Sequence, residues 1–552
     1  MTSERFPKAG EPGSEEGTLR DLRPGETGEK LPSGEDSYVA KVARGAGIST
    51  VGQGVGKVLA FLAQVAIAQL FGLVAFGLYS LGVAAINGAH ILSRFGMENG
   101  VVRYVAHYRT RDDASRVRGT IIQTLLVSLA VSLALSAVMF FGAPFMADWW
   151  YKDPRMETVL HGFAFVLPFF TFMSMVLWTT QGFQTVTYMA YVQHMIRPAL
   201  FLVFLLVFYI LGTELLGIVA AYGVSMLLGA VVGVYYLKML FPPLFDNKVT
   251  PKFETKALFS VSIPMSVSTG AQYLNTWSAI WILGFFAAAA PVGIFQAAAR
   301  TATLSTIVRF AFAGIFSPII SSLHAQGDRE NLGRLYKDVS RWIFTGAFGI
   351  FLAILLLAQD VLVLGFGERA ATGVYALLIV AFAQLYSASV GPTPRMLAMT
   401  DNQNLVMGAT AVAALVGVAV SFTLIGLAST VEYQLVGAAV GMASAIVTEN
   451  TLTLLAVRWR LGFWPYDVAW LKPLAAGIFS AGIAYLTGLL LGLQGVALIL
   501  VVGAVFGVCY LACLLAFGLS DTDREFLEAF WNVAKRYLRR GSRADNRETD
   551  NG

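Results

Sequence analysis

The sequence predicts an all-α, polytopic membrane protein with about 14 transmembrane helices. Hydrophobic residues make up 56% of the 552 positions and charged residues only 13%, and the mean hydropathy is +0.66. A soluble globular chain carries roughly 25% charged residues. Apolar runs long enough to cross a bilayer recur from residue 46 to residue 517. The basic residues between these runs are also distributed unequally, which gives the predicted orientation.

Fourteen spans follow from the lengths of the apolar runs. In chain order they are 46–71, 75–96, 117–142, 158–181, 195–212, 215–240, 257–286, 290–321, 341–365, 372–396, 404–428, 434–457, 472–493 and 495–517. The loops on one side hold Arg103, Arg109, Arg111, Arg116, Arg118, Lys248, Lys252, Lys256, Arg329, Arg334, Lys337, Arg458 and Arg460. The other loops hold only Lys152, Arg155 and Arg369. By the positive-inside rule, this predicts a multi-pass protein of the cell (cytoplasmic) membrane with both termini cytoplasmic.

Six segments are expected from the spans and their flanks. The first is rich in Gly, Glu, Pro and Ser, which predicts disorder. The last contains a capping box at Thr522 and Glu525 and an apolar face opposite basic residues, which predicts an amphipathic helix on the anionic inner membrane surface. The segments are a disordered cytoplasmic tail (1–37), an N-lobe of six spans (38–240), an inter-lobe cytoplasmic linker (241–256), a C-lobe of six spans (257–457), two further spans (458–517), and a cytoplasmic amphipathic helix and tail (518–552).

The two lobes are predicted to be an internal repeat. Phe76-Gly77-Leu78-Tyr79 resembles Val292-Gly293-Ile294-Phe295, and Asp112 corresponds to Asp328 at the same separation of 216 residues. Six spans precede the seventh, so both lobes begin on the inner side and the repeat is parallel. Parallel repeats place a substrate cavity between two lobes and favour alternating access by rocking. Chance similarity between apolar segments is the alternative interpretation.

Two arginines interrupt the eighth span. In a single helix over 290–321, Arg300 and Arg309 would lie inside the hydrocarbon, where each costs roughly 2.5–3.5 kcal/mol. Nine residues at about 100° each place them on opposite sides of a straight helix. Arg300 shares a polar stripe with Gln296 and Thr303, which favours a polar cavity that receives an anion; pairing with a neighbouring helix is the alternative. Arg309 could line the same cavity or extend towards a helix end.

Other polar residues within the spans are candidates for the cavity lining. Lys57 lies inside the first span with Gln53 one turn earlier, although a lysine can also extend to the interface. Gln272 and Asn275 in the seventh span could meet sugar hydroxyls or bond a neighbouring helix. Glu449 in the twelfth span is a candidate for carrying a coupling proton or Na⁺.

The glycine motifs carry a resemblance to a known group. Leu70-Phe71-Gly72 leading into Phe76-Gly77-Leu78-Tyr79-Ser80, and later Val292-Gly293-Ile294-Phe295 with Ala298, resemble the polysaccharide flippases. These belong to the multidrug/oligosaccharidyl-lipid/polysaccharide (MOP) exporter superfamily, with the lipid II flippases and the MATE drug exporters. The resemblance covers roughly residues 40–515. It implies movement of undecaprenyl- or dolichyl-linked sugars, with cationic cavity residues for the anionic headgroup. Arg300 falls where such a residue is expected.

The leading hypothesis is therefore a flippase for lipid-linked oligosaccharide or polysaccharide precursors. A MATE-type multidrug or cation antiporter and a membrane-embedded glycosyltransferase or polymerase are the alternatives. We find no enzyme motif and expect no catalytic residue, metal site or cofactor. Expected partners are the lipid-linked glycan, membrane lipids and glycan-assembly enzymes. The net charge of +5 reflects the loop bias, so nucleic-acid binding is not expected.

Overall fold

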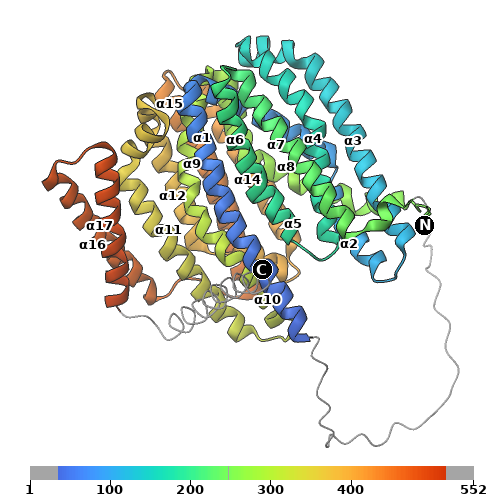
Figure 1. Cartoon of the computed structure of the whole chain (residues 1–552). Helices are drawn as coiled ribbons and strands as arrows, with labels where there is room; N and C mark the ends of the chain where they lie inside the picture. Colours follow the sequence, from blue (N-terminus) through green and yellow to red (C-terminus); the bar gives the residue numbers. More distant parts are fainter. Residues whose placement is uncertain (1–34, 247, 518–552) are drawn as a thin grey trace, which may run out of the picture. The chain divides into compact units, whose positions relative to one another are not determined.

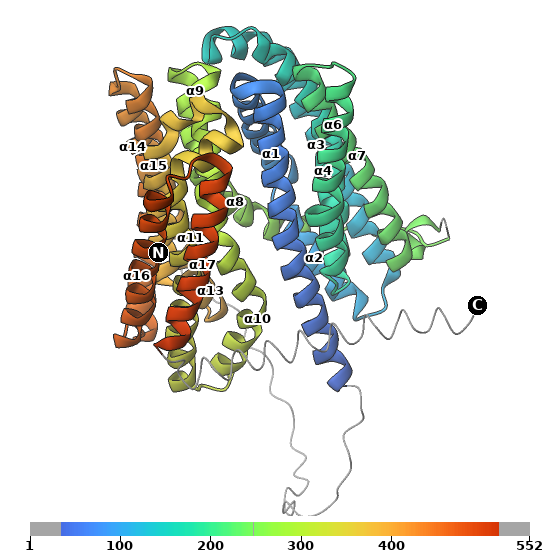
Figure 2. The ribbon, with the colours of Figure 1, turned by 60° about the vertical axis from the view of Figure 1, so that its left-hand side comes forward.

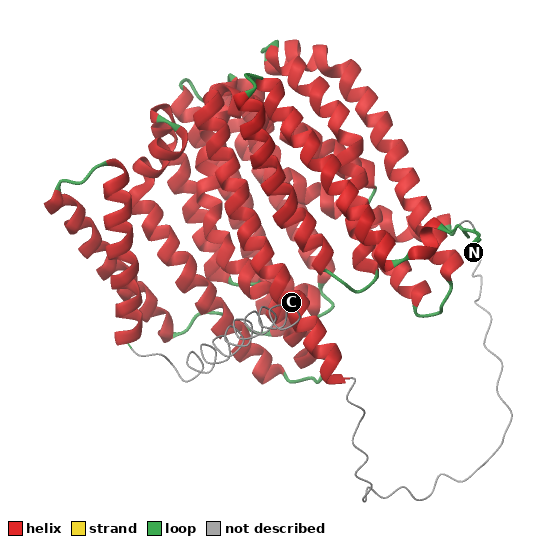
Figure 3. Cartoon of the chain, viewed as in Figure 1, coloured by secondary structure: helices red, strands yellow, loops and turns green. Residues whose placement is uncertain are grey.

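The computed structural model describes residues 35–246 and 248–517. The chain divides into two compact units, Met1–Val42 and Ala43–Gly552, and apart from the start of α1 the elements named here belong to the second. The predicted tail before residue 35 and the predicted C-terminal amphipathic helix lie outside the described residues. Within the described ranges, all of the assigned secondary structure is helical (Figure 3). This confirms the all-α fold.

Helices follow one another along the chain, and some of them are separated by short π or 3₁₀ turns (Figure 1). The α-helices are α1 Glu35–Arg94, α2 Met97–Arg109, α3 Ala114–Phe145, α4 Arg155–Gly182, α5 Thr187–Met189, α6 Arg197–Ile210, α7 Leu215–Leu240, α8 Thr255–Phe286, α9 Ala289–Ala302, α10 Thr306–Ala325, α11 Arg329–Phe366, α12 Val374–Val390, α13 Thr393–Met399, α14 Gln403–Leu427, α15 Val431–Leu461, α16 Leu471–Leu491 and α17 Gly495–Ala516. The π and 3₁₀ turns are η1 Met146–Tyr151, η2 Ala190–Ile196, η3 Pro242–Phe245, η4 Thr303–Ser305, η5 Glu368–Gly373 and η6 Val468–Trp470.

Among the described residues, 11 helical segments are long and apolar enough to cross a membrane. The first, Gly52–Arg94, has 43 residues, enough for two crossings at about 1.5 Å per residue. It bends at Gly72, whose φ of 86° and ψ of 163° are accessible to glycine. Counting this segment twice and adding α8 and the α9–α10 pair gives approximately the fourteen predicted spans.

The predicted continuous helix over 290–321 is wrong in one respect, because η4 interrupts it between α9 and α10. Hydroxyl groups in this segment donate to carbonyl groups three residues earlier: Thr303 to Arg300 O (2.9 Å), Ser305 to Ala302 O (3.0 Å) and Thr306 to Thr303 O (2.7 Å). Such bonds compete with the α-helical pattern and accompany tighter turns. Arg300 consequently lies in the last turn of α9, and Arg309 lies near the start of α10.

The helices pack in two groups. We call α1–α7 the first helix group and α8–α15 the second; α16 and α17 pack against α11, and α2 of the first group also packs against α8 of the second. In Figure 2, α9, α14 and α15 lie on one side of α1, whereas α4, α6 and α7 lie on the other. One hydrophobic core draws residues from both groups, among them Phe76, Phe163, Phe295 and Phe366. Two smaller cores are also present: one around Met97 consists mainly of first-group residues with Leu258 of α8, and one around Tyr336 consists of second-group residues.

Local features agree with the predicted repeat. Gly72, where α1 bends, and Ala288, the extended residue between α8 and α9, are 216 positions apart. Asp113 caps α3 by accepting from the Arg116 backbone N–H, as Asp328 caps α11 by accepting from Asn331. The structural equivalent of Asp328 is therefore Asp113. The predicted correspondence with Asp112 is shifted by one residue, because Asp112 occupies the positive-φ position before the cap.

Candidate functional site

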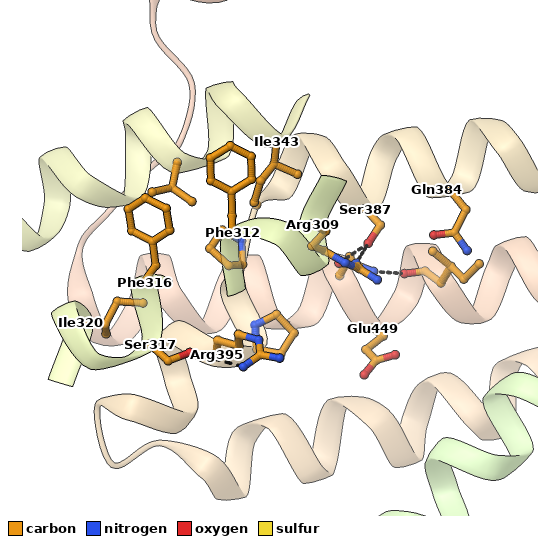
Figure 4. A pocket seen from close by; sticks show the side chains of 16 residues that line it. Arg309, Phe312, Phe316, Ser317, Ile320, Ile343, Gln384, Ser387, Arg395 and Glu449 are labelled. Atoms are coloured by element: carbon orange, nitrogen blue, oxygen red, sulfur yellow. Dashed lines mark hydrogen bonds between the residues drawn. The ribbon is translucent and has the colours of Figure 1, made fainter. Parts of the chain in front are cut away.

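A cavity of about 280 Å³ lies in the second helix group, bordered by α10, α11, α12, α13 and α15 (Figure 4). One part of its lining is apolar and includes Phe312, Phe316, Ile320, Val339 and Ile343. The other part is polar and includes Arg309, Gln384, Ser387, Arg395, Glu449 and Asn450. This division suits an amphiphilic ligand with a charged group and an apolar chain.

Arg309 is positioned in this cavity by residues of two other helices. Its guanidinium donates to the Ser387 hydroxyl on α12, and Ser387 donates to Asn450 Oδ1 on α15 (3.0 Å). Asn450 in turn donates to the Ile446 carbonyl (2.8 Å). The side chain thus points across to α12 and does not extend to a helix end. This arrangement supports the cavity interpretation of Arg309.

Arg395 brings a second guanidinium to the cavity. The backbone break at Gly391 (φ 79°) and Pro392 ends α12 and begins α13, which carries Arg395 to the lining, where it donates to Ser317 (3.3 Å). Arg395 falls at the end of the predicted span 372–396, and the Gly-Pro pair before it is typical of a break in a helix. Among the described lining residues Glu449 is the one carboxylate. The polar lining therefore carries a net charge of +1.

Glu449 and Asn275, predicted as separate candidates, lie together. Glu449 accepts from the Thr410 hydroxyl (2.9 Å), and at the limit of hydrogen bonding from Asn275 Nδ2 (3.5 Å). Asn275 also donates to the Thr410 carbonyl (3.3 Å). These contacts join α8, α14 and α15 behind the cavity. Gln272 is exposed and does not belong to the cavity lining.

Arg300 lies outside this cavity, in a different polar setting. When the Gln296 amide is oriented so that both its oxygen and its nitrogen are satisfied, the oxygen accepts from Arg300 Nε (2.9 Å) and Nη2 (3.1 Å). The guanidinium also lies 5.5 Å from the centre of the Trp277 ring on α8, a cation–π arrangement. Tyr79 and Tyr222 of the first helix group lie within electrostatic range. The C-terminal end of α9 further favours a cation at this position.

Lys57 joins the two helix groups. Its ammonium donates to the Thr306 hydroxyl at the start of α10 (2.9 Å), across a separation of 249 residues. Arg309, one turn further along α10, lies within electrostatic range of Lys57. Gln53 lies one turn before Lys57 and is half-buried. A cation from each group therefore approaches the boundary between them.

Comparisons with known proteins agree with this architecture. A family model described as "Polysaccharide biosynthesis protein" matches residues 42–324, just over half of the chain. The chain belongs to this family. The stage V sporulation protein B of Bacillus subtilis is 23% identical over 426 residues, covering 72% of this chain and 80% of the relative. A probable low-salt glycan biosynthesis flippase of Haloferax volcanii is 21% identical over 203 residues, covering 37% and 42%.

Solved structures show which fold this member of the family has. The lipid II flippase MurJ in an inward closed conformation matches with a TM-score of 0.66 and 13% identity, covering 85% of this chain and 98% of that one. An inward-facing MATE family multidrug resistance transporter of the MOP superfamily matches with a TM-score of 0.57 and 16% identity, covering 74% and 94%. The chain therefore shares the fold of these two transporters. Its family match contains Lys57, Arg300 and Arg309 but ends before Arg395 and Glu449.

Proposed function

We propose that this protein is a flippase that moves a lipid-linked oligosaccharide or polysaccharide precursor across the cytoplasmic membrane by alternating access. The observation that carries the proposal is the placement of Lys57, Arg300, Arg309 and Arg395 at the boundary of the helix groups and in the adjoining cavity. Family membership and the two flippases among the similar proteins support it. The protein is a transporter on this proposal, with no catalytic role for these residues.

The chemistry of these side chains favours an anionic headgroup. Guanidinium groups make paired, charge-assisted hydrogen bonds to phosphate oxygens. The apolar side of the cavity, with Phe312 and Phe316, can accompany the first part of a polyprenyl chain. Lys57 and Arg309 carry like charges at close range, and an anion between them would relieve the repulsion. A lipid pyrophosphate has both the charge and the apolar chain that the cavity requires.

A cation antiporter would need several carboxylates in its cavity, whereas Glu449 is the one carboxylate in the described lining. We assign Glu449 a different role, as the site of a coupling H⁺ or Na⁺. The Thr410 hydroxyl oxygen lies 2.9 Å from Glu449, and the neighbouring Asn275 Oδ1 atom is buried without a hydrogen-bond partner, so a small cation would find several oxygen ligands there. Binding there would also change the field at Arg309, which interacts electrostatically with Glu449.

The domain organisation and orientation form part of the proposal. The first and second helix groups correspond to an N-lobe (38–240) and a C-lobe (257–457), joined by a cytoplasmic linker (241–256) and followed by two further spans (458–517). The excess of lysine and arginine in the inner loops supports cytoplasmic termini. Glycan-assembly enzymes on the inner side would supply the substrate, and membrane lipids would surround the protein.

Reconstitution in lipid vesicles tests the proposal. A polyprenyl-pyrophosphoryl oligosaccharide is incorporated on both leaflets, and an impermeant glycosidase reports how much sugar becomes accessible from outside. The protein should accelerate exchange of this lipid, and it should not accelerate exchange of labelled phosphatidylcholine or efflux of the cationic dye ethidium. Ethidium efflux without lipid exchange would overturn the flippase proposal in favour of the antiporter.

A further inference from the structure

Two glycines in corresponding positions of the two lobes touch each other. A Cβ added at Gly77 of α1 would lie 1.8 Å from the Ala289 carbonyl oxygen and 3.0 Å from the Gly293 nitrogen. A Cβ added at Gly293 of α9 would lie 2.3 Å from the Leu73 carbonyl oxygen and 3.1 Å from the Gly77 nitrogen. The backbones of α1 and α9 are therefore in direct contact, which only glycine permits at these positions.

This contact has the symmetry of the repeat. Gly77 approaches Ala289 while Gly293 approaches Leu73, and both the glycine pair and the pair they approach are 216 positions apart. Equivalent surfaces of the two lobes thus contact each other, as in a two-fold interface. A parallel repeat has its axis along the membrane normal, so the crossing of α1 and α9 lies on the axis about which the lobes are related.

Aromatic side chains extend the contact. Trp150 of η1, in the first helix group, lies 4.8 Å from Phe285 and 6.3 Å from Trp281 of α8, measured between ring centres. Tyr151 lies 6.1 Å from Trp281. The Trp150 Nε1 and Tyr151 Oη atoms are buried without a hydrogen-bond partner. Buried donors without partners destabilise the closed arrangement, and separation of the lobes here would expose them to water or sugar hydroxyls.

The distribution of the cores agrees with closure at this end. The core shared by both helix groups contains Phe76, Leu81 and Phe295, next to the glycine contact. A smaller core around Met97 also includes Leu258 of α8, and the core around Tyr336 lies within the second helix group. The contact between α1 and α9 thus lies within the core that both lobes share.

We propose that the Gly77–Gly293 contact, with Trp150 and Tyr151 packed against Trp281 and Phe285, is the outer gate of the transporter and is closed in this structure. The inference rests on the proposed alternating-access function and adds the residues that control the outer opening. Closure depends on the absence of side chains at both glycines. Real Cβ atoms essentially never come within 3.0 Å of such neighbours, so alanine at Gly77 would push α1 and α9 apart by more than 1 Å. Opening the gate relieves this overlap, and alanine therefore favours the outward-open state.

Thiol accessibility tests the gate without any substrate. In a background with Cys509→Ser and Cys513→Ser, Leu81→Cys places a reporter at a buried position beside Gly284. An impermeant maleimide is then applied to the outside of intact cells. Gly77→Ala and Gly293→Ala should each raise the labelling rate several-fold. The double variant should label little faster than either single variant, because one overlap is sufficient to hold the gate open.

Two glycines on α1 provide matched controls. A Cβ at Gly56 would lie 2.1 Å from the His194 carbonyl oxygen within the first helix group, and a Cβ at Gly54 meets nothing within 4 Å. Gly56→Ala therefore introduces a comparable backbone overlap away from the gate, and Gly54→Ala introduces none. Neither should raise labelling. Equal labelling of Gly77→Ala and Gly54→Ala at normal abundance would overturn the gate.

A further variant guards against failure to fold. Trp281→Ala removes aromatic packing from the gate without adding an overlap, so it should also raise labelling, and unchanged labelling there would count against the proposal.

Substrate exchange in vesicles separates this inference from the proposed function. Altered labelling without exchange of any lipid-linked glycan would refute the flippase and leave the gate intact. Exchange with unaltered labelling would refute the gate alone.

Discussion

Arg309→Gln isolates the contribution of one guanidinium to anion recognition. Glutamine can still donate to Ser387, so the link between α10 and α12 is kept, while the net charge of the polar lining falls from +1 to zero. A hydrogen bond to a charged group contributes about 1.5–3 kcal/mol, and 1.4 kcal/mol corresponds to a factor of ten. We therefore expect kcat/KM for the lipid pyrophosphate to fall by roughly 10- to 100-fold, mainly through KM. Arg309→Lys should recover part of this loss, because an ammonium keeps the charge without the fork geometry.

The assay is initial-rate exchange in vesicles over a range of lipid pyrophosphate contents, at two salt concentrations. Arg334→Gln is the matched control, since it removes an exposed arginine that pairs with Glu330 (2.6 Å) and does not line the cavity. Exposed pairs of this kind contribute about 0–1 kcal/mol, so the control should stay within a few-fold of the wild type. If Arg309→Gln matches Arg334→Gln in kcat/KM, the anion role of Arg309 is refuted.

Three further predictions follow from the site and the orientation. Arg300→Ala should abolish glycan export in cells at normal protein abundance and Arg300→Lys should restore part of it, since lysine cannot reproduce the paired bonds to Gln296; normal export by the alanine variant would exclude an essential role. Glu449→Gln should make exchange in vesicles insensitive to an imposed H⁺ or Na⁺ gradient while equilibrium exchange persists, whereas retained gradient dependence would place coupling elsewhere. Single cysteines at Trp149 and Arg369 should react with an impermeant thiol reagent on intact cells, and a cysteine at Arg334 should not; reaction at 334 would reverse the topology.

The sequence was sufficient to predict the helices because hydrocarbon imposes a length and a composition on each span. The break at Thr303–Ser305 was not predicted, because it depends on hydroxyl groups that compete locally with the α-helical pattern. The one-residue shift from Asp112 to Asp113 has a similar origin, since only the backbone conformation distinguishes the cap from the residue before it.

The candidate site was predictable only in part. Charged residues inside apolar runs identified Lys57, Arg300 and Glu449, because burial makes such residues costly. Their grouping depends on which helices are neighbours: Asn275 and Glu449 are 174 residues apart in the chain. The composition of a span does not specify its neighbours. Arg395 lies in the cavity lining because the backbone bends at Gly391, and the charge of a residue does not predict such a bend.

The cationic residues and the glycine gate have complementary roles in the proposed cycle. With the Gly77 end closed, the Lys57 and Arg309 side chains approach each other from the two lobes at the other part of the boundary. Bringing the lobes closer together at that part would transfer both charges into a drier environment, where their repulsion increases. An anion bound between them removes this cost, so substrate binding favours closure on its own side. Rocking about the axis at Gly77 and Gly293 would then separate α1 from α9 and expose the Trp150 and Tyr151 donors to the emerging glycan.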